Sequence, residues 1–216
     1  MLPYTFEVFS LDHIVSIIVI LFLFIIFLGY NDKIGIEDDS KTFLIVLSVL
    51  MIFLDLSEDL VRIFTGYYSI TKDLPLQLCS IGVYLAAFNL MYRNQTIFNL
   101  IFYWGFVGAT NAILTPDGDL FELRIFFFYS QGYHAALIFA VLWMMIKYDM
   151  RMDYRSILQV VIYTNIIVGL ITIVNYVLDS NYMFLRVMPN SISPFLMGEW
   201  PTYITVSYTH LRAHET

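Results

Sequence analysis

Long apolar runs alternate with short polar segments along most of the chain. Six of these runs have about the 20 apolar residues that a helix needs to cross the hydrocarbon core of a bilayer. They cover residues 13–30, 42–64, 74–92, 96–115, 125–147 and 157–178. Backbone polar groups cannot be left unpaired in lipid, so runs of this length predict transmembrane helices. The pattern therefore predicts an all-α fold, a polytopic transmembrane helix bundle.

The C-terminal end departs from this pattern. After the segment 200–204 the apolar character gives way to VSYTHLRAHET. This tail resembles a translated sequencing adapter, so we expect residues 1–204 to form a single transmembrane helical domain and residues 205–216 to be non-native. The native chain would then continue past Tyr203 into a further span, which makes six spans present of seven. The alternative is a short polar C-terminal tail.

Composition narrows the class of protein. Hydrophobic residues make up 59% of the 216 residues and charged residues only 13%, against about 25% charged in soluble domains. A soluble enzyme is excluded on this ground, and membrane lipids are the expected partners. The 11 Lys and Arg residues form no cluster and the net charge is -7, which excludes nucleic acid as a partner. The single cysteine, Cys79, excludes an intrachain disulfide and a thiolate metal site.

Basic residues between the runs predict the orientation. With the N-terminus outside, the inner loops carry more Lys and Arg than the outer ones, and the densest group falls in the short loop 147–155. The positive-inside rule is most reliable for such short loops. We therefore expect a multi-pass protein with its N-terminus outside.

The second apolar run contains four ionisable residues. Asp55, Glu58, Asp59 and Arg62 are spaced at i, i+3, i+4 and i+7, so they share one helix stripe, with Arg62 placed to pair with Glu58 or Asp59. Ionisable residues inside a span face the bundle interior and indicate a functional site. The alternative is that the helix ends near residue 57 and the charges lie in a solvated turn.

Two nucleophile and base candidates lie in other runs. Cys79 follows Pro75 near the start of the third run, and His134 lies within the fifth. At 1.5 Å per residue they are about 7 Å and about 14 Å from their helix starts, so a meeting requires tilt or an unwound first turn. The alternatives are an inert buried thiol and a packing histidine.

Polar side chains elsewhere complete a candidate polar pocket. Amides between membrane helices often serve only as interhelical hydrogen-bond donors and acceptors. The further members of the pocket are Gln77, Asn111, Asn165, Asn175, Asn181 and Tyr182.

Several segments together are similar to a known family. They are LPLQLC at 74–79, FYWGFVGATNAILTPD at 102–117, FFFYSQGYH at 126–134, NYVLDSNYMFL at 175–185 and GEWPTYI at 198–204. This set resembles the bacterial YwaF family of seven-span integral membrane proteins, which is similar in turn to the eukaryotic transmembrane-164 acyltransferases. The resemblance implies a bacterial cell membrane as the location.

The resemblance also assigns individual residues. The nucleophilic cysteine of the acyltransferases matches Cys79, and the histidine of their fifth span matches His134. Asn175, Asn181 and Tyr182 match family positions without an assigned role. The family usually carries a histidine where this chain has Gln77.

The first functional hypothesis is a lipid acyltransferase or other lipid-modifying enzyme. Cys79 would attack an acyl ester, with His134 as general base and then acid, and Asp55, Glu58 or Asp59 orienting the imidazole. This chemistry needs neither a metal nor a soluble cofactor.

Two alternatives belong to other classes. In a non-catalytic carrier or binding protein, the same carboxylates and amides would hold a cation or a small polar solute. In a structural or assembly partner without a ligand, Gly105, Gly108 and Ala112 would only allow close helix packing.

Overall fold

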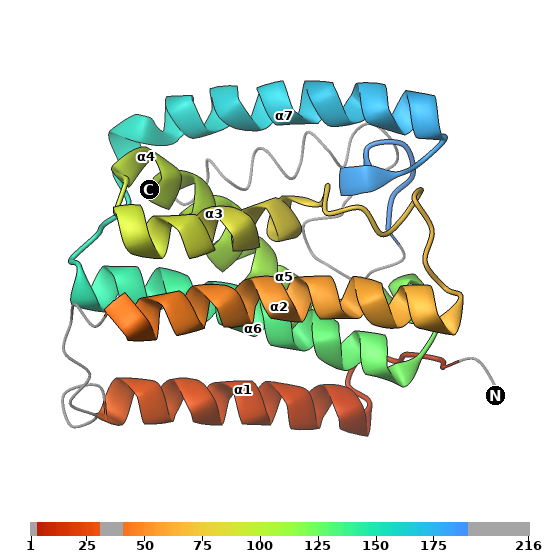
Figure 1. Ribbon diagram of the computed structural model, residues 1–216, viewed down its shortest axis with the longest axis horizontal. Helices are drawn as coiled ribbons and strands as arrows, with labels where there is room; N and C mark the ends of the chain where they lie inside the picture. The colour runs from red at the N-terminus through yellow and green to blue at the C-terminus, as the bar shows by residue number, and fades with distance from the viewer. Residues whose placement is uncertain (1–3, 31–40, 190–216) are drawn as a thin grey trace.

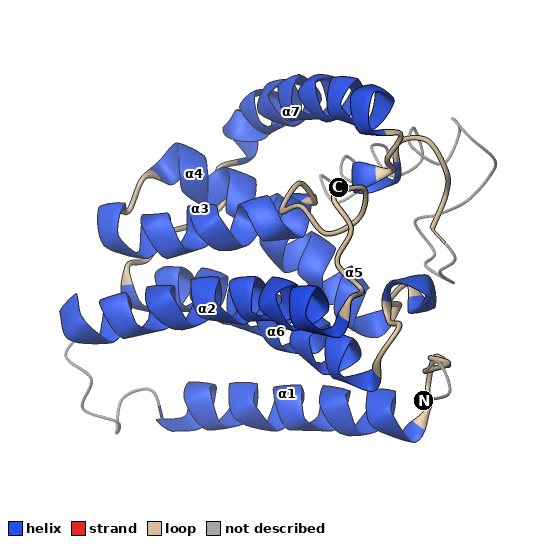
Figure 2. Cartoon of the chain, turned by 45° about the vertical axis from the view of Figure 1, so that its right-hand side comes forward, coloured by secondary structure: helices blue, strands red, loops and turns tan. Residues whose placement is uncertain are grey.

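The computed structural model describes residues 4–30 and 41–189. These residues form helices and loops without a strand (Figures 1 and 2). The predicted all-α fold is therefore confirmed. The predicted seventh span and the tail 205–216 lie outside the described residues. The α-helices are α1 (Leu11–Tyr30), α2 (Lys41–Thr65), α3 (Leu78–Tyr92), α4 (Gln95–Ile101), α5 (Gly108–Leu114), α6 (Arg124–Lys147) and α7 (Ile157–Leu178).

A π-helical turn, η1 (Phe102–Val107), joins α4 to α5 so that the three form one continuous rod. Six rods therefore correspond to the six predicted runs. Among the described residues, four of the rods are long and apolar enough to cross a membrane: α1, the α4–η1–α5 rod, α6 and α7. Four of the six predicted spans are therefore confirmed by length and composition, and α2 and α3 are not among them. Short 3-10 turns occur in the loops at Gly118–Leu120, Tyr154–Ser156 and Tyr182–Phe184.

The start of the third helix differs from its prediction, and the end of the second helix decides between two alternatives. The run predicted at 74–92 becomes a helix only from Leu78 to Tyr92, because the segment that contains Pro75 is not helical and Gln77 has extended backbone angles at the N-cap. The alternative in which the second helix ends near residue 57 is wrong, since α2 continues to Thr65. The charged stripe of α2 is thus helical throughout.

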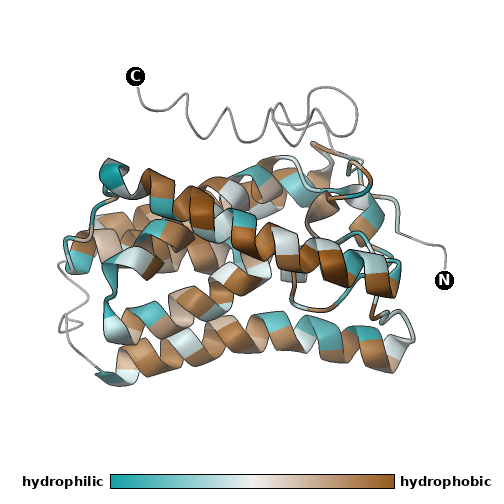
Figure 3. Cartoon of the chain, turned by 90° about the horizontal axis from the view of Figure 1, so that it is seen from above, coloured by the Kyte–Doolittle hydropathy of each residue, from teal (hydrophilic) through white to brown (hydrophobic). Residues whose placement is uncertain are grey.

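The rods are stacked in layers. Figure 1 shows α1 along one face and α7 along the opposite face, with α2, α6, α3 and α4 between them. Large apolar side chains on the outer rods are exposed, among them Phe22 on α1 and Ile173 on α7, and hydrophobic residues follow the helices along their length (Figure 3). Apolar surface on this scale is expected where the helices contact lipid rather than water.

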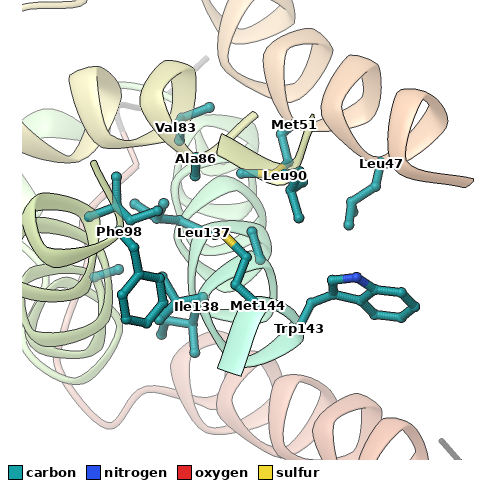
Figure 4. Close-up of a cluster of buried hydrophobic side chains, with 14 of the residues drawn as sticks. Leu47, Met51, Val83, Ala86, Leu90, Phe98, Leu137, Ile138, Trp143 and Met144 are labelled. Atoms are coloured by element: carbon teal, nitrogen blue, oxygen red, sulfur yellow. The ribbon is translucent and has the colours of Figure 1, made fainter. Parts of the chain in front are cut away.

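The main core lies where α2, α3, α4 and α6 meet (Figure 4). At its centre, Leu137 of α6 is fully buried and packs against two glycines. A Cβ atom on Gly105 of η1 would lie 2.9 Å from Leu137 Cγ, and one on Gly82 of α3 would lie 3.3 Å from Leu137 Cδ2. Small residues let membrane helices approach closely, so α3, η1 and α6 converge on Leu137.

We expect Gly105→Ala to destabilise the bundle. The new methyl group would overlap Leu137, which is enclosed on every side, and overpacking of this kind costs about 1–3 kcal/mol. Thermal unfolding of the detergent-solubilised protein measures the loss. Gly132→Ala on α6 is the matched control, because a Cβ there meets nothing within 4 Å. Equal melting temperatures for the two variants would contradict the close approach.

Candidate functional site

A buried cation organises one end of the bundle. Arg62, in the last turn of α2, is 5% exposed. Its Nε and Nη2 donate to Glu58 Oε1 at 3.0 and 2.9 Å, and its Nη1 donates to Glu122 Oε2 at 2.8 Å. The predicted pairing with Glu58 is therefore present. We call this side of the molecule the Arg62 end.

The Arg62 guanidinium also joins segments that are far apart in sequence. Nη2 donates to the carbonyl of Leu120 at 2.8 Å, Nη1 lies 3.5 Å from Asp73 Oδ1, and the guanidinium covers the ring of Phe126 at 4.0 Å from its centroid. Arg62 thus ties α2 to the loop before α3 and to the loop before α6. Burial raises the pKa of Asp73, although the Ser69 N–H and the Arg62 guanidinium act in the opposite direction.

The other carboxylates of the α2 stripe lie deeper or beside this network. Asp55 is buried and accepts a hydrogen bond of 2.7 Å from the hydroxyl of Tyr84 on α3. Asp59 is half-buried and within electrostatic range of Asp55 and Asp73. Within the described part of the chain, no three His, Cys, Asp or Glu side chains are grouped so as to hold a metal ion.

Cys79 occupies the second position of α3 and faces the π-helical turn. Its Sγ lies 3.9 Å from the carbonyl oxygen of Trp104 in η1, and a Cβ on Gly108 would lie 3.6 Å from that sulfur. π-Helical turns are frequent at functional sites because they displace backbone carbonyls from regular pairing. The half-buried Cys79 thiol thus lies between α3 and the α4–η1–α5 rod.

The structure brings Cys79 and His134 to one level of the bundle. Leu137, Gly82 and Gly105 lie at the same height along the bundle axis, because both glycines pack on Leu137. Residues three positions along a helix are about one turn away. His134 lies one turn from Leu137, Cys79 one turn from Gly82, and Gly108 one turn from Gly105, each towards the Arg62 end. Segment 74–77 is not helical, so the first turn of the run predicted at 74–92 is unwound.

The environment of His134 determines its tautomer. The imidazole is buried, and Nδ1 lies 2.7 Å from the carbonyl oxygen of Ser130. A carbonyl only accepts hydrogen bonds, so Nδ1 carries the proton and Nε2 retains a lone pair. A backbone carbonyl therefore orients the ring, whereas the sequence predicted a carboxylate in that role. Among the described residues, no hydrogen bond joins either ring nitrogen to the Cys79 thiol.

Tyr133 is a site residue that the sequence analysis missed. Its ring packs against the imidazole of His134, with centroids 4.2 Å apart. Tyr133 therefore forms one wall of the pocket around His134. The sequence carries no signal for Tyr133 beyond its place directly before His134.

Three members of the predicted polar pocket form a separate network between loops. Asn175 Oδ1 accepts from the Tyr182 N–H at 2.7 Å, and Asn175 Nδ2 donates to the Tyr182 carbonyl at 2.9 Å. The Tyr182 hydroxyl donates to the carbonyl of Ile70 at 2.6 Å, and Gln77 Oε1 accepts from the Met183 N–H at 2.8 Å. This network holds the end of α7 on the segment that leads into Cys79.

The remaining predicted amides bond locally. Asn111 Oδ1 accepts from the Thr115 hydroxyl at 3.2 Å, and exposed Asn165 donates to the carbonyl of Val161 at 2.8 Å. Asn181 Oδ1 accepts from the Arg186 N–H at 2.9 Å. None of these three hydrogen bonds reaches the Cys79 thiol or the His134 imidazole.

We expect Arg62→Met to destabilise the protein strongly. Glu58, Asp73 and Glu122 would lose their shared counter-charge, and breaking a buried ion pair from one side costs about 3–5 kcal/mol. Denaturant unfolding in detergent measures the loss. Arg124→Met is the matched control, because Arg124 is largely exposed in its ion pair with Asp12 and its loss is expected to change stability little. Similar losses in both variants would contradict the special role of Arg62.

The TMEM164 family model matches residues 8–212, which include Cys79 and His134. No curated protein and no solved structure gives a significant match. The family match agrees with the expected similarity to the transmembrane-164 proteins and with the four apolar helices that are long enough to cross a membrane. The chain is thus a multi-pass membrane protein that belongs to the TMEM164 family.

Proposed function

We propose that this protein is a lipid acyltransferase that carries the acyl group on Cys79. The observation that supports the proposal is the common level of Cys79 and His134, one turn from the contact of Leu137 with Gly82 and Gly105. A thiol and an imidazole with a free Nε2 lone pair are the parts that nucleophilic acyl transfer needs. Their position inside a lipid-embedded bundle points to a lipid as the substrate.

In the first half-reaction, His134 Nε2 takes the proton from the Cys79 thiol. The sulfur attacks the carbonyl carbon of a lipid ester, the bond between that carbon and the glycerol oxygen breaks, and the imidazolium returns the proton to this oxygen. The products are a lysolipid and an acyl thioester on Cys79. The long S–H contact to Trp104 is replaced in this step, so the thiol must turn towards the imidazole.

In the second half-reaction, the hydroxyl of another lysolipid attacks the thioester. His134 removes the hydroxyl proton, the carbon–sulfur bond breaks, and the proton passes to the departing sulfur. One ester is thus exchanged for another without an oxidant, a reductant or a cofactor. The phenol of Tyr133, whose ring packs against His134, would donate to the oxyanion that forms on the carbonyl oxygen.

We further propose a bacterial cell membrane as the location, with the N-terminus outside. The similarity to the bacterial YwaF family supports the first point, and the basic loop 147–155 supports the second through the positive-inside rule. Cys79 lies near the Arg62 end, so this orientation puts the reaction in the outer leaflet.

The decisive experiment is transfer of a tagged acyl chain. The full chain in lipid nanodiscs is incubated with a phospholipid that carries an alkyne-tagged acyl group, and protein-bound label that hydroxylamine removes is measured. We expect Cys79→Ala to lose the label completely. His134→Ala is expected to acquire it about 10²–10⁴-fold more slowly, the usual contribution of a general base.

His13→Gln is the matched control, since His13 is also a fully buried histidine but bonds the carbonyl of Ile113 on another side of the bundle. It is expected to keep the labelling rate of the unchanged protein. Labelling that survives Cys79→Ala would overturn the thioester mechanism. In that case cation or solute binding at Asp55, Glu58 and Asp59 becomes the hypothesis to test.

A further inference from the structure

A cavity of about 230 Å³ lies between α1, α6 and the α4–η1–α5 rod. Its lining is apolar except for Thr110, whose hydroxyl donates to the carbonyl of Phe106. A ligand in this cavity would therefore contact hydrocarbon side chains and almost no polar groups. The lining residues are Ile17, Ile20, Leu21 and Phe24 of α1, Phe106 of η1, Thr110, Ile113 and Leu114 of α5, and Ile138 and Leu142 of α6.

The cavity exists because α1 is held to the bundle at two separated points. Near the Arg62 end, His13 Nε2 lies 2.8 Å from the carbonyl oxygen of Ile113. Near the other end, the ring of Phe27 packs on Phe139 and Trp143, with centroids 4.4 and 5.7 Å away. The lining residues of α1, 17 to 24, fall between these points and span about 10 Å. The α1 part of the lining thus lies between two contacts that hold α1 to the bundle.

Its side opens towards the surroundings of the bundle. Two of the lining residues, Leu21 of α1 and Leu114 of α5, are 53% and 48% exposed. In a membrane this opening meets the lipid chains. A water molecule needs two to four polar partners, and cavities lined by aliphatic and aromatic side chains stay dry and take apolar guests. The lining offers water too few partners.

We propose that this cavity binds one hydrocarbon chain of a bilayer lipid. Its volume is smaller than the about 300–1,000 Å³ of pockets that enclose a whole drug-sized ligand, so it takes a chain segment rather than a headgroup. The occupant fills the gap between the two attachment points and packs α1 against α5 and α6.

The cavity proposed to bind a lipid hydrocarbon chain is separate from the proposed thioester site at Cys79. Gly108 of α5 faces the Cys79 sulfur, whereas Thr110, two residues later and about 200° around the helix, lines the cavity. The two sites therefore lie on opposite faces of α5. Lipid binding in the cavity does not require that Cys79 be a nucleophile.

Photo-crosslinking tests the proposal without relying on activity. The full chain is reconstituted in nanodiscs that contain phosphatidylcholine with a diazirine in one acyl chain, irradiated, and mapped by mass spectrometry. We expect labelled residues to concentrate on Phe24, Ile138 and Leu142. Leu21→Trp, which blocks the opening from an exposed position, should lower this labelling at least about tenfold, equivalent to 1.4 kcal/mol of binding free energy.

A second variant and a control separate binding in the cavity from general contact with lipid. Ile138→Phe fills the cavity from within and should lower the labelling in the same way. Leu170 on α7 is exposed to a similar extent, 58%, but lies outside the lining, so Leu170→Trp should leave the labelling unchanged. Unchanged labelling of the lining in Leu21→Trp, or labelling spread evenly over the exposed apolar residues, overturns the proposal. Using Cys79→Ala as the background keeps the outcome independent of acyl transfer.

Discussion

The contact of Leu137 with Gly82 and Gly105 is the constraint on which the rest of the bundle depends. Three rods come within van der Waals distance around this one side chain, and dispersion forces between closely packed helices are a main source of association in lipid, where the hydrophobic effect between helices is absent. The same contact determines the heights along the bundle axis of the residues one turn closer to the Arg62 end. Cys79, Gly108 and His134 lie one turn away because their helices are locked at Leu137.

Arg62 compensates the negative charge that gathers at one end of the bundle. Three carboxylates from α2 and two loops approach one another there, and uncompensated charges in a poorly solvated region are costly. The planar guanidinium donates to Glu58, Glu122 and the Leu120 carbonyl at once, which an ammonium group on a flexible stem does less well. The loops that precede α3 and α6 are thereby held beside α2, and the helix that carries Cys79 starts from a defined position.

The candidate site was only partly predictable from the sequence. Cys79 and His134 stand out because a thiol and an imidazole are rare in this apolar chain, and the spacing of Glu58 and Arg62 predicts their ion pair. Tyr133 does not stand out among the 16 tyrosines. Gln77, Asn175 and Tyr182 were grouped with the thiol, but they join the end of α7 to the segment before α3 instead. Backbone groups of the segment after α7 satisfy Gln77 and Asn175, and the carbonyl of Ile70 satisfies the Tyr182 hydroxyl.

The sequence by itself determined the helical class and, within the described residues, the positions of the six rods and most of their boundaries, since the cost of unpaired backbone groups in lipid makes apolar length a direct indicator of helices. It did not determine which residues meet. That depends on relative rotation and axial shift of the rods, which are decided by side-chain fit between distant segments. The start of α3 at Leu78, the level shared by Cys79 and His134, and the gap beneath α1 are consequences of this packing, and no local pattern encodes them.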